Sequence, residues 1–368
     1  MPAKYHDVVP RVEHSTASNM SYWVVGDTQL WPVGYFDVAG WTDFTPSVPG
    51  EFDRMDPAGF DATRRLQRMD EYGIDVALLY PNLVGFQGEL VRTLGSELSQ
   101  EVVRVYNDFQ TEWAAADPTR LIPIAMLPYW DRDAAVTEML RCVEMGHRGV
   151  LFANKFARIG LPAFTDPYWD AIYGAAQELD IPINYHIGFS LPEFEDSLTE
   201  QSLKAKRANP AYRAEKAVTG GIITMSQAAT LGALVTSGIC DRFPNLKLVS
   251  VETGFGHLPM YFEHLDWHWK AYGNWHDAGS QGLLPSEYFR RQCYGTFWFE
   301  RASLRLLDLY PDNFMFSTDF PHPTSVTPGP CSPADVPSVH LDAAFSSLDP
   351  VIAEKAISGN ARRLYNLS

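Results

Sequence analysis

Short apolar runs alternate with amphipathic helical stretches over most of the 368 residues. Most of the runs carry apolar residues at both odd and even positions, which point to opposite faces of a strand. This pattern is typical of strands that are buried on both faces of a parallel sheet. Alternation of strands with helices predicts βαβ units. Seven strands are expected: VALLYP (76–81), LIPIAML (121–127), GVLFA (149–153), IPINYHI (181–187), LKLVSVE (246–252), CYGTFWF (293–299) and FMFSTDF (314–320).

Eight helices are expected between and after these strands. In a (β/α)8 barrel every helix follows a strand, but the first predicted helix has no convincing strand before it. The pattern therefore predicts one α/β domain over residues 1–368, a barrel of the TIM type that lacks its first strand. The predicted helices span 61–72, 89–116, 131–145, 166–179, 219–241, 257–271, 301–310 and 349–366.

Three segments interrupt the alternation. Residues 1–60 are rich in Pro, Gly, Asp and aromatic residues without a clean period, so we expect an irregular N-terminal segment. Residues 188–218 and 266–288 follow strands, and we expect both to be loops at the C-terminal rim of the barrel, where loops shape substrate pockets. Trp267 and Trp275 in the second loop would then cover a pocket for an apolar or aromatic substrate.

The charge excludes some partners. The chain carries 45 acidic and 29 basic residues, a net charge of −16, with no cluster of Lys and Arg, so neither nucleic acid nor an anionic membrane is an expected partner. The start MPAKYHDVVPRV is too polar for a signal peptide, and no apolar run is long enough to span a bilayer. The cysteines lack metal-binding spacing and are expected to be buried thiols of a cytoplasmic protein: Cys142, Cys240, Cys293 and Cys331.

Polar residues that end apolar strands are the candidates for chemistry. His186 in INYHIG is a candidate metal ligand or catalytic group, and the alternative is a core histidine bonded to a backbone carbonyl. Asp319 in FSTDFPHP closes a buried strand and must be paired or coordinated. It is either one partner of an ion pair with an arginine or a metal-linked carboxylate that moves a proton.

Two further residues flank these candidates. Glu252 in LVSVETGFGH is a possible ligand, acid, base or ion-pair partner, next to a turn that contains Gly254 and Gly256. His322 either binds the substrate by a hydrogen bond or caps the turn before Pro323. The sequence contains no GxGxxG, no GxxxxGK[ST] and no GxSxG, so phosphate loops and a nucleophile elbow are not indicated.

Several long segments together resemble the amidohydrolase-2 family, the metal-dependent TIM-barrel group that includes aminocarboxymuconate-semialdehyde decarboxylase and related hydrolases. The resemblance covers nearly the whole chain. It implies a divalent metal held by an Asp/His-x-His pair on the first strand, a histidine on the fifth and an aspartate on the eighth. His186 and Asp319 match the last two. The segments are DPYWDAIYGAAQELDIPINYHIG, SGICDRFPNLKLVSVETGFGHLPMYFEHLDW, LLPSEYFRRQCYGTFWFE, PDNFMFSTDFPHPTS and GNARRLYNL.

Two departures from the family pattern shape the functional hypothesis. The first-strand metal motif is absent from this sequence, in agreement with the count of seven strands. The similar decarboxylases carry a catalytic histidine near the end of the sixth strand, where this sequence has Glu252. The leading hypothesis is therefore a hydrolase that uses metal-activated water on a small organic acid, ester or amide. His186 and Asp319 would hold the metal, and Asp319, Glu252 and His322 would be catalytic.

Zinc is the expected metal, with manganese or iron as alternatives, and the substrate is a small molecule. Decarboxylation without oxidation is the alternative reaction. A third hypothesis is an incomplete, inactive barrel without metal, in which residues 15–40 with SYWVVGD supply a substitute strand. By analogy with the family, the chain is a possible homodimer.

Overall fold

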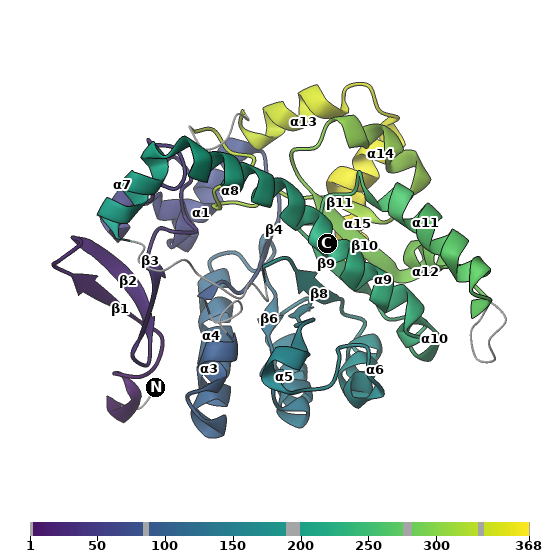
Figure 1. The fold of residues 1–368 in the computed structure, drawn as a ribbon, viewed down its shortest axis with the longest axis horizontal. Coiled ribbons are helices and arrows are strands. Elements are labelled where there is room, and N and C mark those ends of the chain that lie inside the picture. Colours follow the sequence, from purple (N-terminus) through teal and green to yellow (C-terminus); the bar gives the residue numbers. More distant parts are fainter. Residues whose placement is uncertain (1–2, 84–87, 189–198, 275–281, 330–334, 368) are drawn as a thin grey trace.

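The computed structural model describes residues 3–83, 88–188, 199–274, 282–329 and 335–367. All seven predicted strand regions form strands of one barrel, which confirms the TIM-type α/β fold (Figure 1). The 121–127 region contains two short strands in a row, which flank Ile124. The barrel strands are β4 (Ala77–Leu79), β5 (Leu121–Pro123), β6 (Ala125–Met126), β7 (Val150–Leu151), β8 (Ile183–His186), β9 (Leu248–Val251), β10 (Cys293–Phe297) and β11 (Phe314–Phe316).

Every pair of neighbouring barrel strands is parallel, in the order β4, β5–β6, β7, β8, β9, β10, β11. The β5–β6 region pairs on both edges: the N–H of Ile124 donates to the carbonyl of Leu79 (3.0 Å), and the N–H of Ala125 donates to that of Gly149 (2.9 Å). Within the described residues no strand joins β11 to β4. The barrel therefore has seven strand positions, as the sequence pattern predicts.

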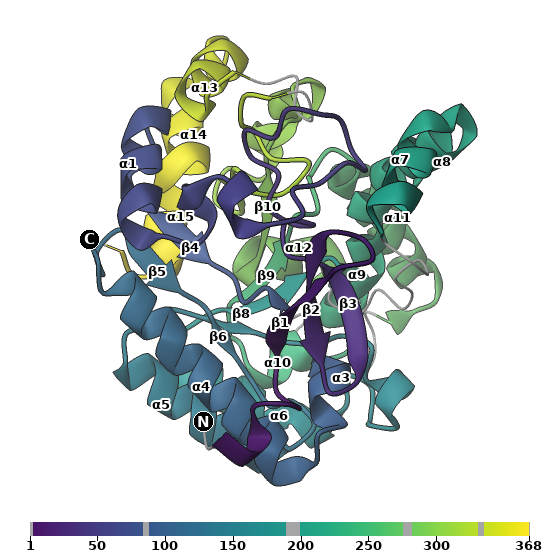
Figure 2. The same cartoon turned by 90° about the vertical axis from the view of Figure 1, so that its left-hand side faces the viewer.

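Helices surround these strands (Figures 1 and 2). Their ends follow local sequence signals: the Asp61 side chain caps α1 through the N–H of Arg64, and Gly73 ends that helix in the left-handed conformation. The helices are α1 (Ala62–Tyr72), α3 (Gly88–Arg92), α4 (Ser96–Ala114), α5 (Arg132–Glu144), α6 (Asp170–Glu178), α7 (Glu200–Ala208), α8 (Pro210–Ile223), α9 (Ala228–Thr236), α10 (Ile239–Arg242), α11 (Leu258–Ala271), α12 (Pro285–Gln292), α13 (Pro337–Phe345), α14 (Pro350–Glu354) and α15 (Asn360–Leu364).

The N-terminal segment is more regular than its composition predicts. β1 (Arg11–Ser15), β2 (Met20–Val25) and β3 (Thr28–Pro32) form an antiparallel sheet, a separate layer to one side of the barrel strands in Figure 1. The SYWVV run lies in β2 and pairs with β1 and β3, so the hypothesis that it replaces the first barrel strand is wrong. Apolar side chains of this sheet form a small core of their own, and this packing stabilises the sheet.

The two predicted rim loops are largely helical where the structure describes them. Residues 199–218 belong to α7 and α8, which start at the caps Thr199 and Asn209. Residues 266–271 complete α11, and α12 begins at Pro285. Capping residues and Pro at the first turn are helix signals that the mixed charge of these segments obscured. Residues 189–198 and 275–281 lie outside the described residues.

The barrel core is built from fully buried residues of both the strands and the surrounding helices, including Ile183, Leu248 and Phe314. Cys142, Cys240 and Cys293 are buried free thiols, as expected, and Cys331 lies outside the described residues. By length and composition alone, one helical stretch of the described chain, Pro210–Thr236, is long and apolar enough to cross a membrane, which is weak evidence for a span.

Candidate active site

His186 ends β8 with its imidazole buried; 4% of the side chain is exposed. Its Nδ1 lies 2.6 Å from the carbonyl oxygen of Ile187. The ring proton is therefore assigned to Nδ1, which donates it in a hydrogen bond to that carbonyl. Nε2 then points toward Glu252, whose Oε1 lies 3.1 Å away. A backbone carbonyl that fixes one ring nitrogen of a histidine is the arrangement that orients metal-binding imidazoles.

Glu252 and Asp319 follow the ends of β9 and β11, and both adopt left-handed backbone angles, with φ of 57° and 56°. This conformation is rare for residues other than Gly, Asn and Asp, and it clusters at functional sites. The N–H of Glu252 donates to Oγ1 of Thr296 (2.7 Å), which holds the turn in place. Gly254 is required two residues later, because a Cβ there would lie 2.2 Å from Oε1 of Glu300 and φ is +60°.

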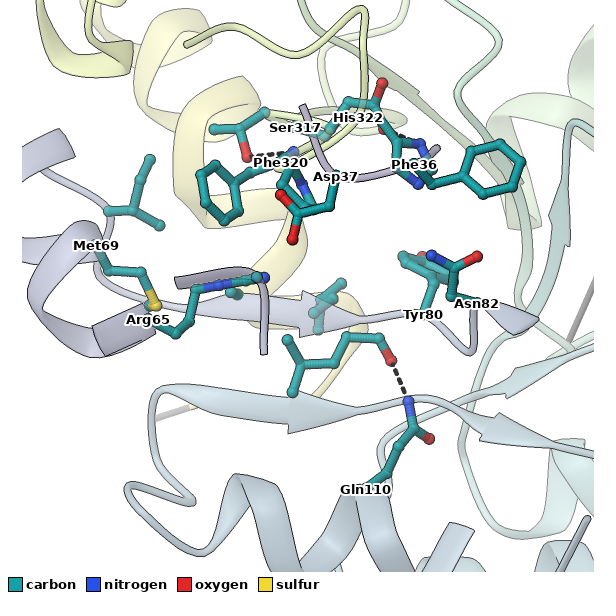
Figure 3. A pocket seen from close by; sticks show the side chains of 18 of the residues that line it. Phe36, Asp37, Arg65, Met69, Tyr80, Asn82, Gln110, Ser317, Phe320 and His322 are labelled. Carbon is teal, nitrogen blue, oxygen red and sulfur yellow. Dashed lines mark hydrogen bonds and ion pairs between the residues drawn. The ribbon is translucent and has the colours of Figure 1, made fainter. Parts of the chain in front are cut away.

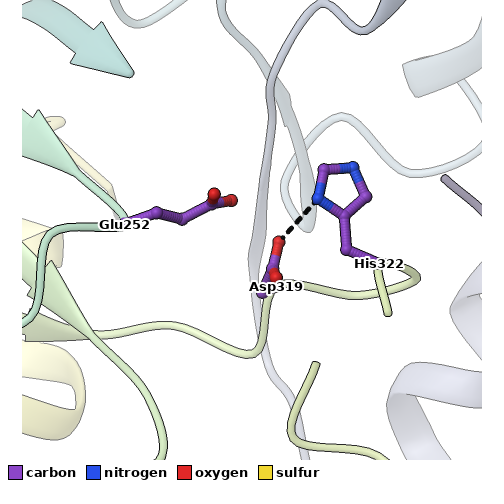
Figure 4. Close-up of side chains that lie close together, drawn as sticks. All are labelled: Glu252, Asp319 and His322. Atoms are coloured by element: carbon purple, nitrogen blue, oxygen red, sulfur yellow. Dashed lines mark ion pairs between the residues drawn. The ribbon is translucent and has the colours of Figure 1, made fainter. Parts of the chain in front are cut away.

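Asp319 is held from two sides. Its Oδ1 lies 3.0 Å from Nδ1 of His322, and its Oδ2 accepts a hydrogen bond from Oγ1 of Thr324 (2.8 Å). Figure 4 shows the carboxylate of Glu252, which follows β9, directed toward this pair. One ligand atom from each of Glu252, Asp319 and His322 lies within 4.8 Å of the others.

The two carboxylates of this cluster have pKa values that are shifted in opposite directions. Burial opposes ionisation of Glu252, but His186 and the other neighbours lower the pKa of Glu252 to about 2. Burial and the nearby charge of Glu252 raise the pKa of Asp319 to about 7. Burial alone would lower the pKa of His322, yet Asp319 raises it to about 9. The cluster thus pairs an ionised glutamate with a carboxyl group that can exchange a proton near neutral pH.

The donor set fits a divalent cation. Two carboxylates and two imidazoles converge here, and this mixture of oxygen and nitrogen donors suits Zn²⁺, Mn²⁺ or Fe²⁺. The carboxylate of Glu252 is close enough to raise the pKa of Asp319, because the two negative charges repel each other. A cation bound between the two carboxylates would reduce this repulsion. Glu252, Asp319 and His322 are the candidate ligands, with Nε2 of His186 next to them.

All four candidate residues of the sequence meet in this cluster. His186 forms the hydrogen bond to a backbone carbonyl that one alternative describes, and it also contacts Glu252. Its role as a metal ligand or catalytic group stays a prediction. Asp319 pairs with His322 instead of an arginine. The role of each residue in catalysis stays a prediction.

A cavity of about 890 Å³ opens beside the cluster and includes His186, Glu252, Asp319 and His322 in its wall. The N-terminal segment contributes aromatic residues to this wall, including Trp23, Trp31 and Phe36, and helices α1 and α4 contribute others, such as Tyr72 and Trp113. The expectation that Trp267 covers the pocket is wrong: its side chain lies on α11, is 72% exposed and is not part of the wall. Helix α11 directs this residue to solvent. Trp275 lies outside the described residues.

Three polar residues of the cavity wall were not predicted from the sequence (Figure 3): Asp37, Arg65 and Tyr80. Burial raises the pKa of Asp37 to about 7 and lowers that of Arg65 to about 10, although each residue partly offsets the effect on the other. The ring of Tyr80 meets the ring of His186 edge to face at 5.5 Å. Asp37 and Arg65 lie outside the predicted strands in the sequence and belong to no periodic pattern. Only the tertiary structure therefore shows that they line this cavity.

Comparison with known proteins identifies the family. The Amidohydrolase family model matches residues 24–367, nearly the whole chain. The chain belongs to the amidohydrolase family. Among curated relatives, this amidohydrolase is 29% identical over 273 residues to the gamma-resorcylate decarboxylase of Polaromonas sp. (strain JS666 / ATCC BAA-500) and 28% identical over 268 residues to that of Rhizobium sp. (strain MTP-10005). Each match covers 70% of this chain and 76% of the relative.

Solved structures support the same fold. An amidohydrolase of Mycobacterium avium subsp. paratuberculosis K-10 matches with a TM-score of 0.69 at 17% identity, over 100% of this chain and 93% of that one. The dihydroxybenzoic acid decarboxylase of Polaromonas sp. JS666, with bound manganese and the inhibitor 2-nitroresorcinol, matches with a TM-score of 0.59 at 23% identity, over 83% and 85% of the two chains. At these identities the structures show the shared fold alone.

Proposed function

We propose that this amidohydrolase is a metal-dependent, non-oxidative decarboxylase of hydroxylated benzoates, with 2,6-dihydroxybenzoate (gamma-resorcylate) as the first substrate to test. The observation that carries this proposal is the likeness, over 70% of the chain, to relatives that are gamma-resorcylate decarboxylases. The cavity supports it, because aromatic side chains line it and a protonatable carboxyl group reaches into it. The leading hypothesis from the sequence, a hydrolase, has support only at the level of the family.

The residues that would hold the metal are Glu252, Asp319 and His322, with His186 beside them. Manganese is our first choice, because a decarboxylase of this fold binds it, and zinc is the alternative. A bound divalent cation supplies a Lewis acid that binds and polarises oxygen atoms of the substrate.

The remaining chemistry is a proton transfer. Decarboxylation breaks the bond between the ring carbon and the carboxylate carbon, releases CO2, and leaves an electron pair on the ring carbon that must take up one proton. Asp319 is the proposed donor, since its carboxyl group lies in the wall of the cavity next to the cluster, where it can pass one proton to the ring carbon. His322, 3.0 Å from Oδ1, is the proposed group that orients Asp319.

The cavity also provides the means to hold the substrate. The rings of Phe36 and His322 lie 5.5 Å apart, centroid to centroid, next to the cluster and offer surfaces for an aromatic ring. The positive charge of Arg65 on the same wall favours an anionic substrate. A small aromatic acid satisfies both features.

The test is direct. Purified protein reconstituted with Mn²⁺ is mixed with 2,6-dihydroxybenzoate, and resorcinol is measured by chromatography with released CO2 in equal amount. In D2O the product should carry one deuterium on the ring carbon that lost the carboxylate. Asp319→Asn should reduce the rate by roughly 10²- to 10⁴-fold, the usual contribution of a positioned acid or base. Turnover of esters or amides without CO2 would support the hydrolase, and no turnover with metal bound would favour an inactive barrel.

We also propose that the chain is a cytoplasmic homodimer. The buried free thiols support a reducing compartment. The exposed apolar face of α8 and the turn after it supports a contact with a second copy, because Val218, Ile222 and Met225 lie on it at helical spacing.

A further inference from the structure

Tyr80 connects the candidate metal site to the interior of the barrel. It directly follows β4, and its side chain forms part of the cavity wall (Figure 3). Its ring meets the ring of His186 at 5.5 Å between centroids, with the two planes at 65°. Its hydroxyl contacts Asn184 and Tyr365, which are both buried. One side chain therefore touches a candidate metal ligand and two residues that lie outside the cluster.

The hydrogen bonds of the Asn184 side chain are complete. Its Oδ1 accepts from the hydroxyls of Tyr80 (3.0 Å) and Tyr365 (2.6 Å), which uses both lone pairs of that oxygen. Its Nδ2 donates to the backbone carbonyls of Val150 (3.2 Å) and Pro182 (3.3 Å), which uses both amide protons. A buried polar network in which every group is satisfied holds its side chains in one arrangement. The hydroxyl of Tyr80 is therefore fixed in position.

The strand β8 places this anchor next to His186. Asn184 and His186 are two residues apart on β8, so their side chains point to the same face of the strand. Tyr80 bonds to Asn184 through its hydroxyl and contacts His186 through its ring. The phenol ring of Tyr80 therefore bridges two successive side chains on one face of β8.

The segment after β11 supplies the second hydroxyl of the network. Tyr365 directly follows α15 and is 1% exposed. Before it, Nδ2 of Asn360 donates to the carbonyl of Phe314 in β11 (2.8 Å). After it, Nδ2 of Asn366 lies 3.3 Å from Oδ2 of Asp180, in the turn that leads into β8. The segment that carries Tyr365 is thus held to the barrel on both sides of this residue.

Two contacts restrain the imidazole of His186 in different ways. The hydrogen bond from Nδ1 to the carbonyl of Ile187 restrains one ring atom, but a single hydrogen bond does not fix the plane of the ring. The edge-to-face contact with Tyr80 restrains that plane. With both contacts in place, Nε2 lies 3.1 Å from Oε1 of Glu252. Groups that orient a ligating imidazole in this way contribute to metal affinity.

Tyr80 is poorly suited to bind a metal or to exchange a proton itself. Burial raises the pKa of its hydroxyl further above the ordinary value, so the phenol stays neutral at neutral pH. Its hydroxyl proton is donated to Asn184. The role that fits these contacts is to hold His186.

We propose that Tyr80 is a positioning residue of the candidate metal site. It holds the imidazole of His186 in the orientation in which Nε2 faces Glu252, and Asn184 and Tyr365 anchor it. Neither anchor belongs to the cavity wall, so part of the metal affinity comes from residues that no ligand in the cavity touches. This inference rests on the proposed metal site and does not depend on the proposed reaction.

The first measurement uses the metal-free full chain. NMR follows the exchange of the Nδ1 proton of His186 with water. Tyr80→Leu, which removes both the ring and the anchored hydroxyl, should speed this exchange by roughly tenfold or more. Tyr80→Phe and Tyr365→Phe keep the ring but weaken its anchor, so each should give a smaller increase.

Tyr288→Phe is the matched control. The buried hydroxyl of Tyr288 donates to Oδ1 of Asp241 on α10 (2.6 Å), and Tyr288 is not part of the cavity wall. Its loss removes a buried hydrogen bond of the same kind at another place, so the exchange at His186 should stay at the wild-type rate.

The second measurement is metal binding. Tyr80→Leu should weaken Mn²⁺ binding by roughly 10- to 100-fold in a calorimetric titration. It should also shift the visible absorption bands of the Co²⁺-loaded chain, because these bands depend on the geometry of the ligands. Tyr80→Phe should give the same changes at smaller size, and Tyr288→Phe should leave both readouts unchanged.

Wild-type exchange of the Nδ1 proton in folded Tyr80→Leu would overturn the proposal. Equal changes in Tyr80→Leu and Tyr288→Phe would also overturn it, since they would reflect a general loss of stability. If Tyr80→Leu fails to fold, Tyr80→Phe and Tyr365→Phe replace it in both measurements. A wild-type chain that binds Mn²⁺ without decarboxylating 2,6-dihydroxybenzoate would refute the proposed reaction alone, so the two failures are distinguishable.

Discussion

Nε2 of His186 and Oε1 of Glu252 lie 3.1 Å apart, although 65 residues separate them in the chain. The two residues end adjacent parallel strands, β8 and β9, whose register pairs His186 with Val251. The left-handed backbone at Glu252 then turns its carboxylate back over the barrel. This contact at the candidate metal site thus follows from strand register and one unusual backbone conformation.

The first prediction tests this pair. Burial lowers the pKa of His186, but the charge of Glu252 and the hydrogen bonds to Glu252 and Ile187 together offset this effect, so the net shift is upward. Glu252→Gln should therefore bring the pKa of His186 below its ordinary value. An NMR titration of the metal-free protein measures it, and manganese affinity should fall by roughly 10- to 100-fold. An unchanged histidine pKa would show that Glu252 is not the group that controls it.

The second prediction concerns the stability of the metal-free protein. The pKa of Asp37 is about 7 in the folded chain and 3.8 ordinarily, so the folded state holds the extra proton between these values. Stability therefore falls as pH rises from about 4 to about 7. Asp37→Asn should remove this loss, which amounts to a few kcal/mol at most. Urea unfolding of both proteins across this pH range measures the difference, and parallel curves would contradict the assignment.

The third prediction concerns the hydrogen bonds inside the barrel. Oδ1 of the fully buried Asn184 accepts from the hydroxyls of Tyr80 (3.0 Å) and Tyr365 (2.6 Å). Asn184→Leu leaves buried polar groups without their partner, so the free energy of unfolding should drop by roughly 2–4 kcal/mol. Denaturant unfolding measures this drop. Tyr365→Phe, which removes only one donor, should cost less, and an equal loss in both variants would argue against a shared network.

The fourth prediction addresses the proposed homodimer. Ile222 on α8 is 59% exposed, and an aspartate there would place a charge in the proposed contact. Ile222→Asp should convert the dimer to a monomer, as measured by light scattering after size-exclusion chromatography. Val351→Asp, at an equally exposed site on α14, is the control and should stay dimeric. If the wild-type protein is a monomer in this measurement, the proposed homodimer is wrong.

The amino-acid sequence by itself determined the barrel and its chemical residues. Apolar residues on both parities identified the seven buried strands, because a strand covered on both faces tolerates few polar positions. The same rule made His186, Glu252 and Asp319 conspicuous as polar residues at strand ends. Their convergence followed, since the C-terminal ends of parallel strands meet at one rim.

Only the tertiary structure decided the remaining features. The sheet formed by residues 11–32 depends on pairing with itself and on a small core of its own, which no local period reveals. Asp37 and Arg65 reach the cavity from outside the barrel strands, and their burial is a property of the packed molecule. The cavity is lined by residues of both β4 and β11, which are far apart in sequence, and sequence patterns report local periodicity but not the distance between such strands.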